Sequence, residues 1–284
     1  MERIEQLKLQ TEDLESKLDA GLIVREDENS VLVSFHHMME YYLYAAYYRQ
    51  DKVIRPTTED YALWYREIGE AAMQEEKYHA AAKAFKKAVD WNPVDLDALL
   101  DLAEAEKHIG HLERFRAVTE QLYYFCASRA TMARYYRNMG YYYTSKYKPE
   151  IAKVCYEYSN LYYHTENADS ELAYLAAAME SAGLASATGI HKENELLKDQ
   201  ASGLNSASDA KQGYSREQIA EMQKVLVSEK IEPGPEEKTI RVLYEAGGEL
   251  LKQGQDSLAK DCFTLVYDIT QNPDVLALLE QLDA

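Results

Sequence analysis

A glycine inside a helical pattern, Gly69, constrains the fold of this chain more than any other residue. Around it, Tyr65, Ile68 and Ala72 recur at the spacing of one helix face. A glycine in a helix interior costs about 1 kcal/mol relative to alanine. We expect close packing to compensate for this cost, because a residue without a Cβ lets a facing helix approach its backbone.

The facing helix follows directly in the sequence. It carries the small residues Ala81 and Ala88 on either side of Phe85, and Pro93 stands where it should end. We expect the ring of Phe85 to fill the space that Gly69 leaves. The pattern therefore predicts an antiparallel pair of helices that pack unusually close together.

The same pattern recurs along the chain. The clear later copies contain Tyr136, Met139, Gly140, Tyr143, Ala152 and Tyr156, and then Leu243, Ala246, Gly247, Leu250, Gly254, Ala259 and Phe263. The copy around Ala103 is degenerate, with Phe115 for the first small residue and Thr119 for the aromatic one. A further partial copy offers Thr188 and Lys192 at these two positions.

These residues resemble the tetratricopeptide repeat, a 34-residue helix–turn–helix unit with the signature W-x-x-L-G-x-x-Y, A-x-x-x-F and a closing P. The resemblance, which is to tetratricopeptide repeat proteins of bacterial type, implies an all-α fold. It would be an α-solenoid of stacked antiparallel helix hairpins with degenerate capping helices at both ends. The expected segments are a helical hairpin at 1–57, repeats near 62–95, 96–129, 133–166 and 169–202 within an array at 58–202, a loop and connecting helix at 203–239, and a last repeat with a capping helix at 240–284.

Two segments outside the clear repeats have their own signals. The apolar stretch from Val31 to Tyr48 predicts a buried amphipathic helix, running from about Asn29 to Gln50, because it contains Glu40 and is too short and polar to cross a membrane. Residues 199–214 are rich in Ser, Gly, Asn and Asp and predict a loop. Ser215 and Gln218 then form a capping box that begins the next helix.

Composition narrows the class of partner. The net charge of −18, from 49 acidic and 31 basic residues, argues against nucleic acid and against anionic membrane surfaces. The charged beginning of the chain lacks the apolar core of a secretion signal. The three cysteines, Cys126, Cys155 and Cys262, lack the paired spacing of a metal site and are expected to be buried thiols. We therefore expect a cytoplasmic protein.

Residues with catalytic or metal-binding chemistry are few. His36 and Glu40 would share a helix face, but two ligands do not make a metal site and no second pair accompanies them. The sequence contains no phosphate loop, nucleotide fingerprint or nucleophile elbow. We expect no catalytic residue, no cofactor and no metal, and thus no enzymatic activity.

Tyrosine is unusually frequent, with 24 residues in the chain, of which 13 fall between Tyr123 and Tyr174. Tyrosine buries a large ring while its hydroxyl seeks a partner, and it is also enriched at interfaces. These residues therefore predict either wide packing between helices or an adhesive surface, and the sequence leaves both interpretations open.

In tetratricopeptide proteins the first helix of each repeat lines an inner groove, where partners bind. The resemblance carries this role to Arg66, Glu70, Met73, Glu104, Lys107, Arg134, Arg137 and Tyr141. Some relatives that bind chaperones clamp the terminal carboxylates of a peptide with bases and amides. That clamp is not expected here, because Glu70 and Asp101 place negative charge where amides should donate.

We therefore predict a non-enzymatic scaffold or adaptor that binds a protein or peptide through the groove. One alternative is a self-associating structural or regulatory protein, in which tyrosines or the apolar helix at Val275–Leu282 pair with a second copy. Another is a peptide-sensing regulator similar to the pheromone receptors of Gram-positive bacteria, although the first 57 residues predict no basic helix-turn-helix. A third is an enzyme whose site lies outside the repeats.

Overall fold

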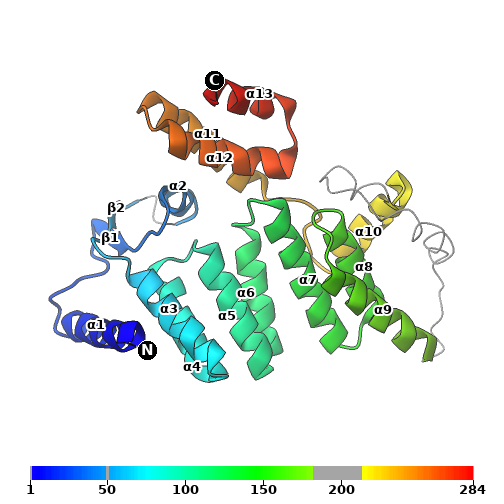
Figure 1. Cartoon of the computed structure of the whole chain (residues 1–284), viewed down its shortest axis with the longest axis horizontal. Coiled ribbons are helices and arrows are strands. Elements are labelled where there is room, and N and C mark those ends of the chain that lie inside the picture. Colours follow the sequence, from blue (N-terminus) through cyan, green and yellow to red (C-terminus); the bar gives the residue numbers. More distant parts are fainter. Residues whose placement is uncertain (1, 49–50, 182–212, 284) are drawn as a thin grey trace. The chain divides into compact units, whose positions relative to one another are not determined.

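The computed structural model describes residues 2–48, 51–181 and 213–283. These residues are predominantly helical, with one short two-stranded sheet (Figure 1). The elements are α1 Glu2–Asp19, β1 Ser30–Val33, α2 Met38–Tyr47, β2 Val53–Pro56, α3 Tyr61–Gln74, α4 Tyr78–Trp91, α5 Leu96–Ile109, α6 Leu112–Tyr123, α7 Arg129–Ser145, α8 Pro149–Asn160, α9 Glu166–Ser181, α10 Arg216–Ser228, α11 Glu237–Lys252, α12 Asp256–Thr270 and α13 Pro273–Leu282. The expected all-α class is confirmed.

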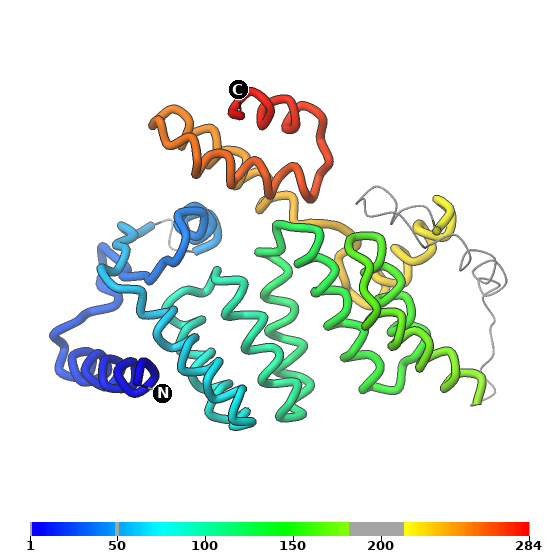
Figure 2. The backbone as a smooth tube through the Cα atoms, viewed as in Figure 1, coloured from blue at the N-terminus to red at the C-terminus, as the bar shows by residue number. Residues whose placement is uncertain are grey.

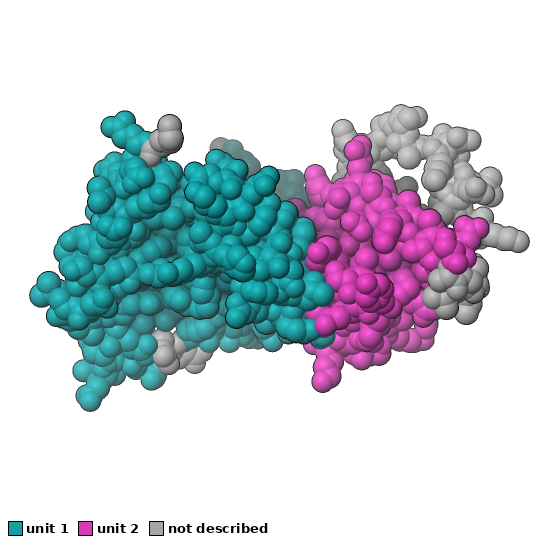
Figure 3. Space-filling model, turned by 90° about the horizontal axis from the view of Figure 1, so that it is seen from below, with its two compact units in different colours: residues 1–127, 236–284 teal, residues 128–235 magenta. Residues whose placement is uncertain are grey.

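The chain forms two compact units, which Figure 3 shows in different colours. Unit 1 contains residues 1–127 and 236–284, and unit 2 contains residues 128–235. The division falls inside the repeat array that the sequence presents as one segment at 58–202. It also groups the last repeat with the beginning of the chain.

In unit 1, α3 packs against α4, α4 against α5 and α5 against α6, in sequential order (Figure 1). The close contact predicted at Gly69 is present. A Cβ on Gly69 would come within 2.5 Å of Cε1 in the ring of Phe85, which is almost completely buried. Only glycine leaves room for this ring, so the prediction of an aromatic wedge is confirmed.

The same relation recurs in both units. A Cβ on Gly140 of α7 would lie 2.8 Å from the ring of Tyr156 in α8, and a Cβ on Gly247 of α11 would lie 2.8 Å from Phe263 in α12. In the degenerate copy, Ala103 and Thr119 are both fully buried instead. Ala103 stands where the other copies have glycine, and Thr119 stands where they have an aromatic ring. The extra methyl group of Ala103 takes up part of the space, and the smaller Thr119 fills the rest of the helix interface.

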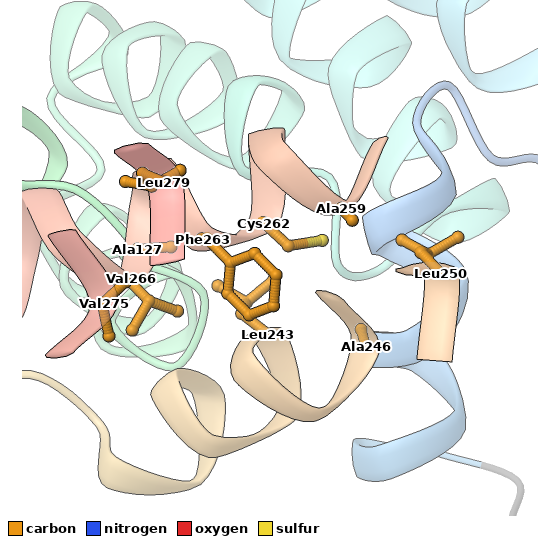
Figure 4. Close-up of a cluster of buried hydrophobic side chains, with 10 residues drawn as sticks. All are labelled: Ala127, Leu243, Ala246, Leu250, Ala259, Cys262, Phe263, Val266, Val275 and Leu279. Carbon is orange, nitrogen blue, oxygen red and sulfur yellow. The ribbon is translucent and has the colours of Figure 1, made fainter. Parts of the chain in front are cut away.

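The last helices of unit 1, α11 and α12, run antiparallel and are followed by α13 (Figure 2). Their core is apolar, and in Figure 4 the ring of Phe263 lies among its side chains. Helix α2 packs against α11. Thr239 fixes this junction, because its Oγ1 donates to the carbonyl of Tyr124 and lies 2.8 Å from the hydroxyl of Tyr47.

The beginning of the chain differs from the prediction. The expected helix from 29 to 50 is wrong: Ser30–Val33 is a strand that pairs in parallel with Val53–Pro56, and the helix α2 spans only Met38–Tyr47. Helix α1 packs on α3, and α2 packs on α11, in place of the expected hairpin of two helices. The β-branched residues of the short apolar run suit a strand, and the partner strand provides its backbone hydrogen bonds.

In unit 2, α7 and α8 form a hairpin, and both α9 and α10 contact α8. The predicted capping box is confirmed: Gln218 N donates to Ser215 Oγ at 3.2 Å, and Ser215 N donates to Gln218 Oε1 at 2.6 Å. The partial copy at Thr188 and Lys192, and nearly all of the loop predicted at 199–214, lie outside the described residues.

Among the helices that the structure describes, none is long and apolar enough to cross a membrane. Cys126, Cys155 and Cys262 are buried free thiols, as expected. Burial raises the pKa of the Cys262 thiol to about 11, so at neutral pH it is protonated and behaves as a small apolar side chain.

Candidate functional site

The first candidate residues lie on α3 and α5 of unit 1. Arg66 on α3 is surrounded by carboxylates: its Nε lies 2.8 Å from Asp101 and 3.3 Å from Glu70, and its Nη1 lies 3.1 Å from Asp97. Two of these acids belong to the next repeat, which brings its first helix beside α3. The guanidinium of Arg66 is therefore neutralised within the chain.

The electrostatics of this cluster follow from its composition of one base and three acids. Burial acts to lower the pKa of Arg66, but the hydrogen bond and charge of Asp101 raise it above its ordinary value. Burial raises the pKa of Glu70, and Asp101 adds to this while Arg66 opposes it. The face formed by these residues is consequently acidic.

Further along the same face, Glu104 of α5 binds two bases. Its Oε1 lies 2.7 Å from Lys107 Nζ and 3.3 Å from His108 Nε2. The imidazole of His108 stacks on Tyr78 with ring centroids 4.5 Å apart. Met73 is half-buried on the last turn of α3. The predicted polar residues of unit 1 therefore form two clusters of ion pairs, one around Arg66 and one around Glu104.

The remaining candidate residues lie on α7 of unit 2. Most of this helix is buried, including Tyr136, Met139, Gly140 and Tyr143. One half-exposed stripe remains at helical spacing, and we call it the α7 stripe. It consists of Arg134, Arg137, Tyr141 and Thr144.

Arg137 is the most unusual residue of the α7 stripe. Its Nη1 donates to the carbonyl of Tyr163 at 3.5 Å, which is a long hydrogen bond. Burial lowers the pKa of Arg137, and the like charge of Arg134 lowers it further. This is the opposite of Arg66, whose pKa the neighbouring acids raise.

The structure thus brings five of the eight predicted residues together in unit 1 and three in unit 2. Sequence reasoning missed the partners of Arg66, although it had singled out Glu70 and Asp101 as acids at the clamp positions. A signal was present, since Asp97 and Asp101 lie about one repeat after Arg66. Tyr163 lies in the loop after α8, and its carbonyl accepts a hydrogen bond from Arg137. The sequence gives no sign of this contact, because Tyr163 is one of many tyrosines in this segment.

The tyrosines divide into two groups. Those that are buried serve packing, and in the middle of the chain they are Tyr123, Tyr135, Tyr136, Tyr142, Tyr143, Tyr156 and Tyr158. Others are largely exposed: Tyr147 is 93% exposed, Tyr174 63% and Tyr163 54%. The packing interpretation is therefore confirmed for the buried tyrosines, and the adhesive surface stays a prediction for the exposed ones.

Comparison with known protein families gives a match within unit 1. Residues 72–122 match the family description of the tetratricopeptide repeat, a segment that begins at the end of α3 and includes α4, α5 and most of α6. The chain contains tetratricopeptide repeats. A search of curated proteins finds no match to the chain. The matched segment includes Ala103 and Thr119, so the copy with the degenerate packing residues belongs to the repeats.

Glu40, which follows the two histidines before the first repeat, is occupied by hydrogen bonds within the chain. Glu40 Oε2 accepts hydrogen bonds from the backbone N of His36 and His37 at 2.7 and 3.1 Å, and from Asn92 Nδ2 at 2.8 Å. Its carboxylate is therefore used to cap α2. Within residues 2–48, 51–181 and 213–283, no group of three or more His, Cys, Asp or Glu side chains could hold a metal ion.

Proposed function

We propose that this protein is a non-enzymatic scaffold that binds a protein or peptide segment along the first helices of its tetratricopeptide repeats. Such repeats are in general protein-interaction modules, which supports a binding role. The α7 stripe carries this proposal. Arg134, Arg137 and Tyr141 take no part in the apolar core and present charge and an aromatic ring at helical spacing.

The face on α3 and α5 is a weaker anchor for a partner. Arg66 already pairs with Asp97 and Asp101, and a ligand carboxylate would have to displace them. A basic partner group would meet a surplus of acids there instead. For this reason the proposal assigns the main contact to unit 2.

The direct test compares capture of partners by the wild-type protein and by Arg134→Glu/Arg137→Glu. The matched control is Arg216→Glu/Lys224→Glu, which makes the same change of net charge at two exposed positions on α10 of the same unit. We expect the first variant to lose partners that the control retains. Equal recovery by both variants would remove the α7 stripe from the proposal.

A second candidate is self-association, favoured by the exposed rings of Tyr147, Tyr163 and Tyr174. Light scattering over a range of concentrations tests it, and a constant monomer mass would contradict it. The proposal also includes a cytoplasmic location, supported by three free thiols, and no catalytic activity. A hydrolase screen on the purified chain checks the latter.

A further inference from the structure

The hydrogen bonding of Arg137 leaves this side chain poorly satisfied. A guanidinium carries five N–H donors in a planar fork, and Arg137 uses one of them in a long bond of 3.5 Å to the Tyr163 carbonyl. No ion pair joins Arg137 to a carboxylate in the part of the chain that the structure describes. Arg66, at a similar place in its repeat, has three acids within 3.3 Å.

The surroundings of Arg137 add positive charge. Arg134 lies one turn earlier on the same helix face, and the other titratable groups that act on Arg137 are the phenols of Tyr156 and Tyr163. The burial of a charged group without a counter-ion is unfavourable. An incoming anion would relieve this cost, and its carboxylate could accept two parallel hydrogen bonds from the guanidinium.

Two tyrosines border the arginines. Tyr141 follows one turn after Arg137 on α7, and Tyr163 is 54% exposed. Each offers an apolar ring for the stem of an acidic side chain and a hydroxyl as a further donor. The chain as a whole has a net charge of −18, so an acidic partner is repelled by most of its surface and attracted by this stripe. This difference in charge between the α7 stripe and the rest of the surface directs an acidic partner to the stripe.

We propose that the α7 stripe, with Tyr163, binds an acidic peptide segment of a partner protein through the side-chain carboxylates of that segment. This inference rests on the proposed function and names the partner chemistry for the same face. Residues at i and i+3 of a helix have Cβ atoms about 5–6 Å apart, and alternate side chains of an extended peptide are about 7 Å apart. The spacing of Arg134 and Arg137 therefore matches that of two acidic side chains on one face of such a peptide, and Arg137 is the residue that meets a carboxylate.

The test uses the full chain and fluorescently labelled synthetic peptides. The probe is a peptide of alternating Glu and Ser with an amidated C-terminus, so that only side-chain carboxylates are available. The same peptide with Gln for Glu is the control, and oligodeoxythymidine is included as a different polyanion. We expect the Glu peptide to bind and the Gln peptide to bind at least about tenfold more weakly, at low ionic strength.

Variants then assign the site. Arg137→Gln should weaken binding of the Glu peptide by about tenfold or more, and Arg137→Lys should give an intermediate loss because the charge is kept and the planar fork is not. Lys224→Gln, at a position 74% exposed on α10, should change nothing. Thermal melting checks the fold, and Arg137→Gln should melt no lower than the wild type because it removes a charge that burial penalises.

Three results would overturn the inference: equal binding of the Glu and Gln peptides, equal binding by wild type and Arg137→Gln, or preferential binding of the oligonucleotide. If partner capture still depends on the α7 stripe while the Glu peptide fails, the scaffold function stands and the acidic partner does not. If neither the peptide nor any captured protein depends on the stripe, both proposals fail.

Discussion

The ring of Phe263 lies against the backbone of Gly247, where a Cβ would come within 2.8 Å of its Cε1 atom. A Cβ on the neighbouring Gly248 would meet nothing within 4 Å. Both glycines belong to α11, so they share a helical backbone and differ in what faces them. The pair separates the two effects of glycine in a helix, which are lost helix propensity and close packing.

Alanine substitutions at these two positions should act in opposite directions. Gly248→Ala should stabilise the protein by about 1 kcal/mol, because alanine is the better helix former. Gly247→Ala should destabilise it by about 1–3 kcal/mol, because the new methyl group overlaps Phe263. Urea unfolding of the two variants and the wild type measures both changes, and shifts of the same sign would contradict the packing role of Gly247.

The pairing of glycine with an aromatic residue could be predicted because both partners are local in sequence. Gly69 and Phe85, like Gly140 and Tyr156, fall within one helix hairpin, and the repeat spacing identifies them. The same holds for the capping box at Ser215, which depends only on residues three apart. Such local patterns can be predicted without knowing how distant segments of the chain pack together.

Other features depend on segments that the sequence does not connect. The run Ser30–Val33 continues an apolar pattern into the following helix, and only its pairing with Val53–Pro56 makes it a strand. The candidate positions on the first helices followed from the repeat register. Their charge partners did not, because the pairs of Arg66 with Asp97 and Asp101 require one repeat to lie beside the next.

A buried hydroxyl at Thr119 offers a second prediction. Within the described residues, Thr119 Oγ1 is buried and has no hydrogen-bond partner. Valine has nearly the same shape, and an unsatisfied buried polar group costs about 1–3 kcal/mol. Thr119→Val should therefore raise the free energy of unfolding by about 1 kcal/mol or more. Differential scanning calorimetry would show this as a higher Tm.

The control for Thr119 is Thr239, which is also fully buried but whose Oγ1 donates to the Tyr124 carbonyl. Thr239→Val should destabilise the protein by about 1–3 kcal/mol, since it leaves the carbonyl without this donor. A loss of stability at both positions would indicate that Thr119 does find a hydrogen bond, and the explanation of the degenerate repeat would then need revision.

The ion pair of Lys153 and Glu157 within α8 should be sensitive to the loss of one partner. Its N–O distance is 2.9 Å, and the two side chains are only 11% and 5% exposed. Lys153→Met leaves the Glu157 carboxylate buried and uncompensated, at a cost of about 3–5 kcal/mol. The double variant Lys153→Met/Glu157→Leu should recover most of this loss, because an apolar pair of similar volume replaces the ions.

The exposed pair of Lys86 and Asp90 in α4 is the matched control, since it has the same spacing of four residues and side chains 60% and 46% exposed. Lys86→Met should change the free energy of unfolding by about 1 kcal/mol or less. Urea unfolding of all variants gives the comparison. Similar losses at Lys86 and Lys153 would contradict the role of burial.

Two tyrosine hydroxyls hold the segment before α11 in unit 2. Tyr136 donates to the carbonyl of Glu232 at 2.7 Å, and Tyr158 donates to the carbonyl of Pro233. Tyr136→Phe keeps the buried ring and removes the hydrogen bond to Glu232, so we expect a loss of at least about 0.5–1.5 kcal/mol. Tyr147→Phe, at a position 93% exposed, should have no effect on the unfolding midpoint, and a loss at both positions would point to a general effect of the hydroxyl.

The buried carboxyl of Glu40 should make stability depend on pH. Burial raises the pKa of Glu40 from 4.5 to about 7, and the charge of Asp95 adds to this, while hydrogen bonds from His37, His36 and Asn92 oppose it. The folded protein therefore holds a proton that the unfolded chain releases in this range. Because the folded state binds more protons, its stability falls as pH rises from about 4.5 to about 7 and then levels off.

Glu40→Gln removes this titration while its amide oxygen can still accept the capping hydrogen bonds. The difference in unfolding free energy between variant and wild type should change with pH in favour of the variant, by on the order of 3 kcal/mol between pH 4.5 and pH 8. The pKa of Asp95 is also raised, first by burial, but Asp95 is present in both proteins and its main contribution cancels. Urea unfolding across this range measures the difference, and a constant offset at every pH would show that folding does not raise the pKa of Glu40.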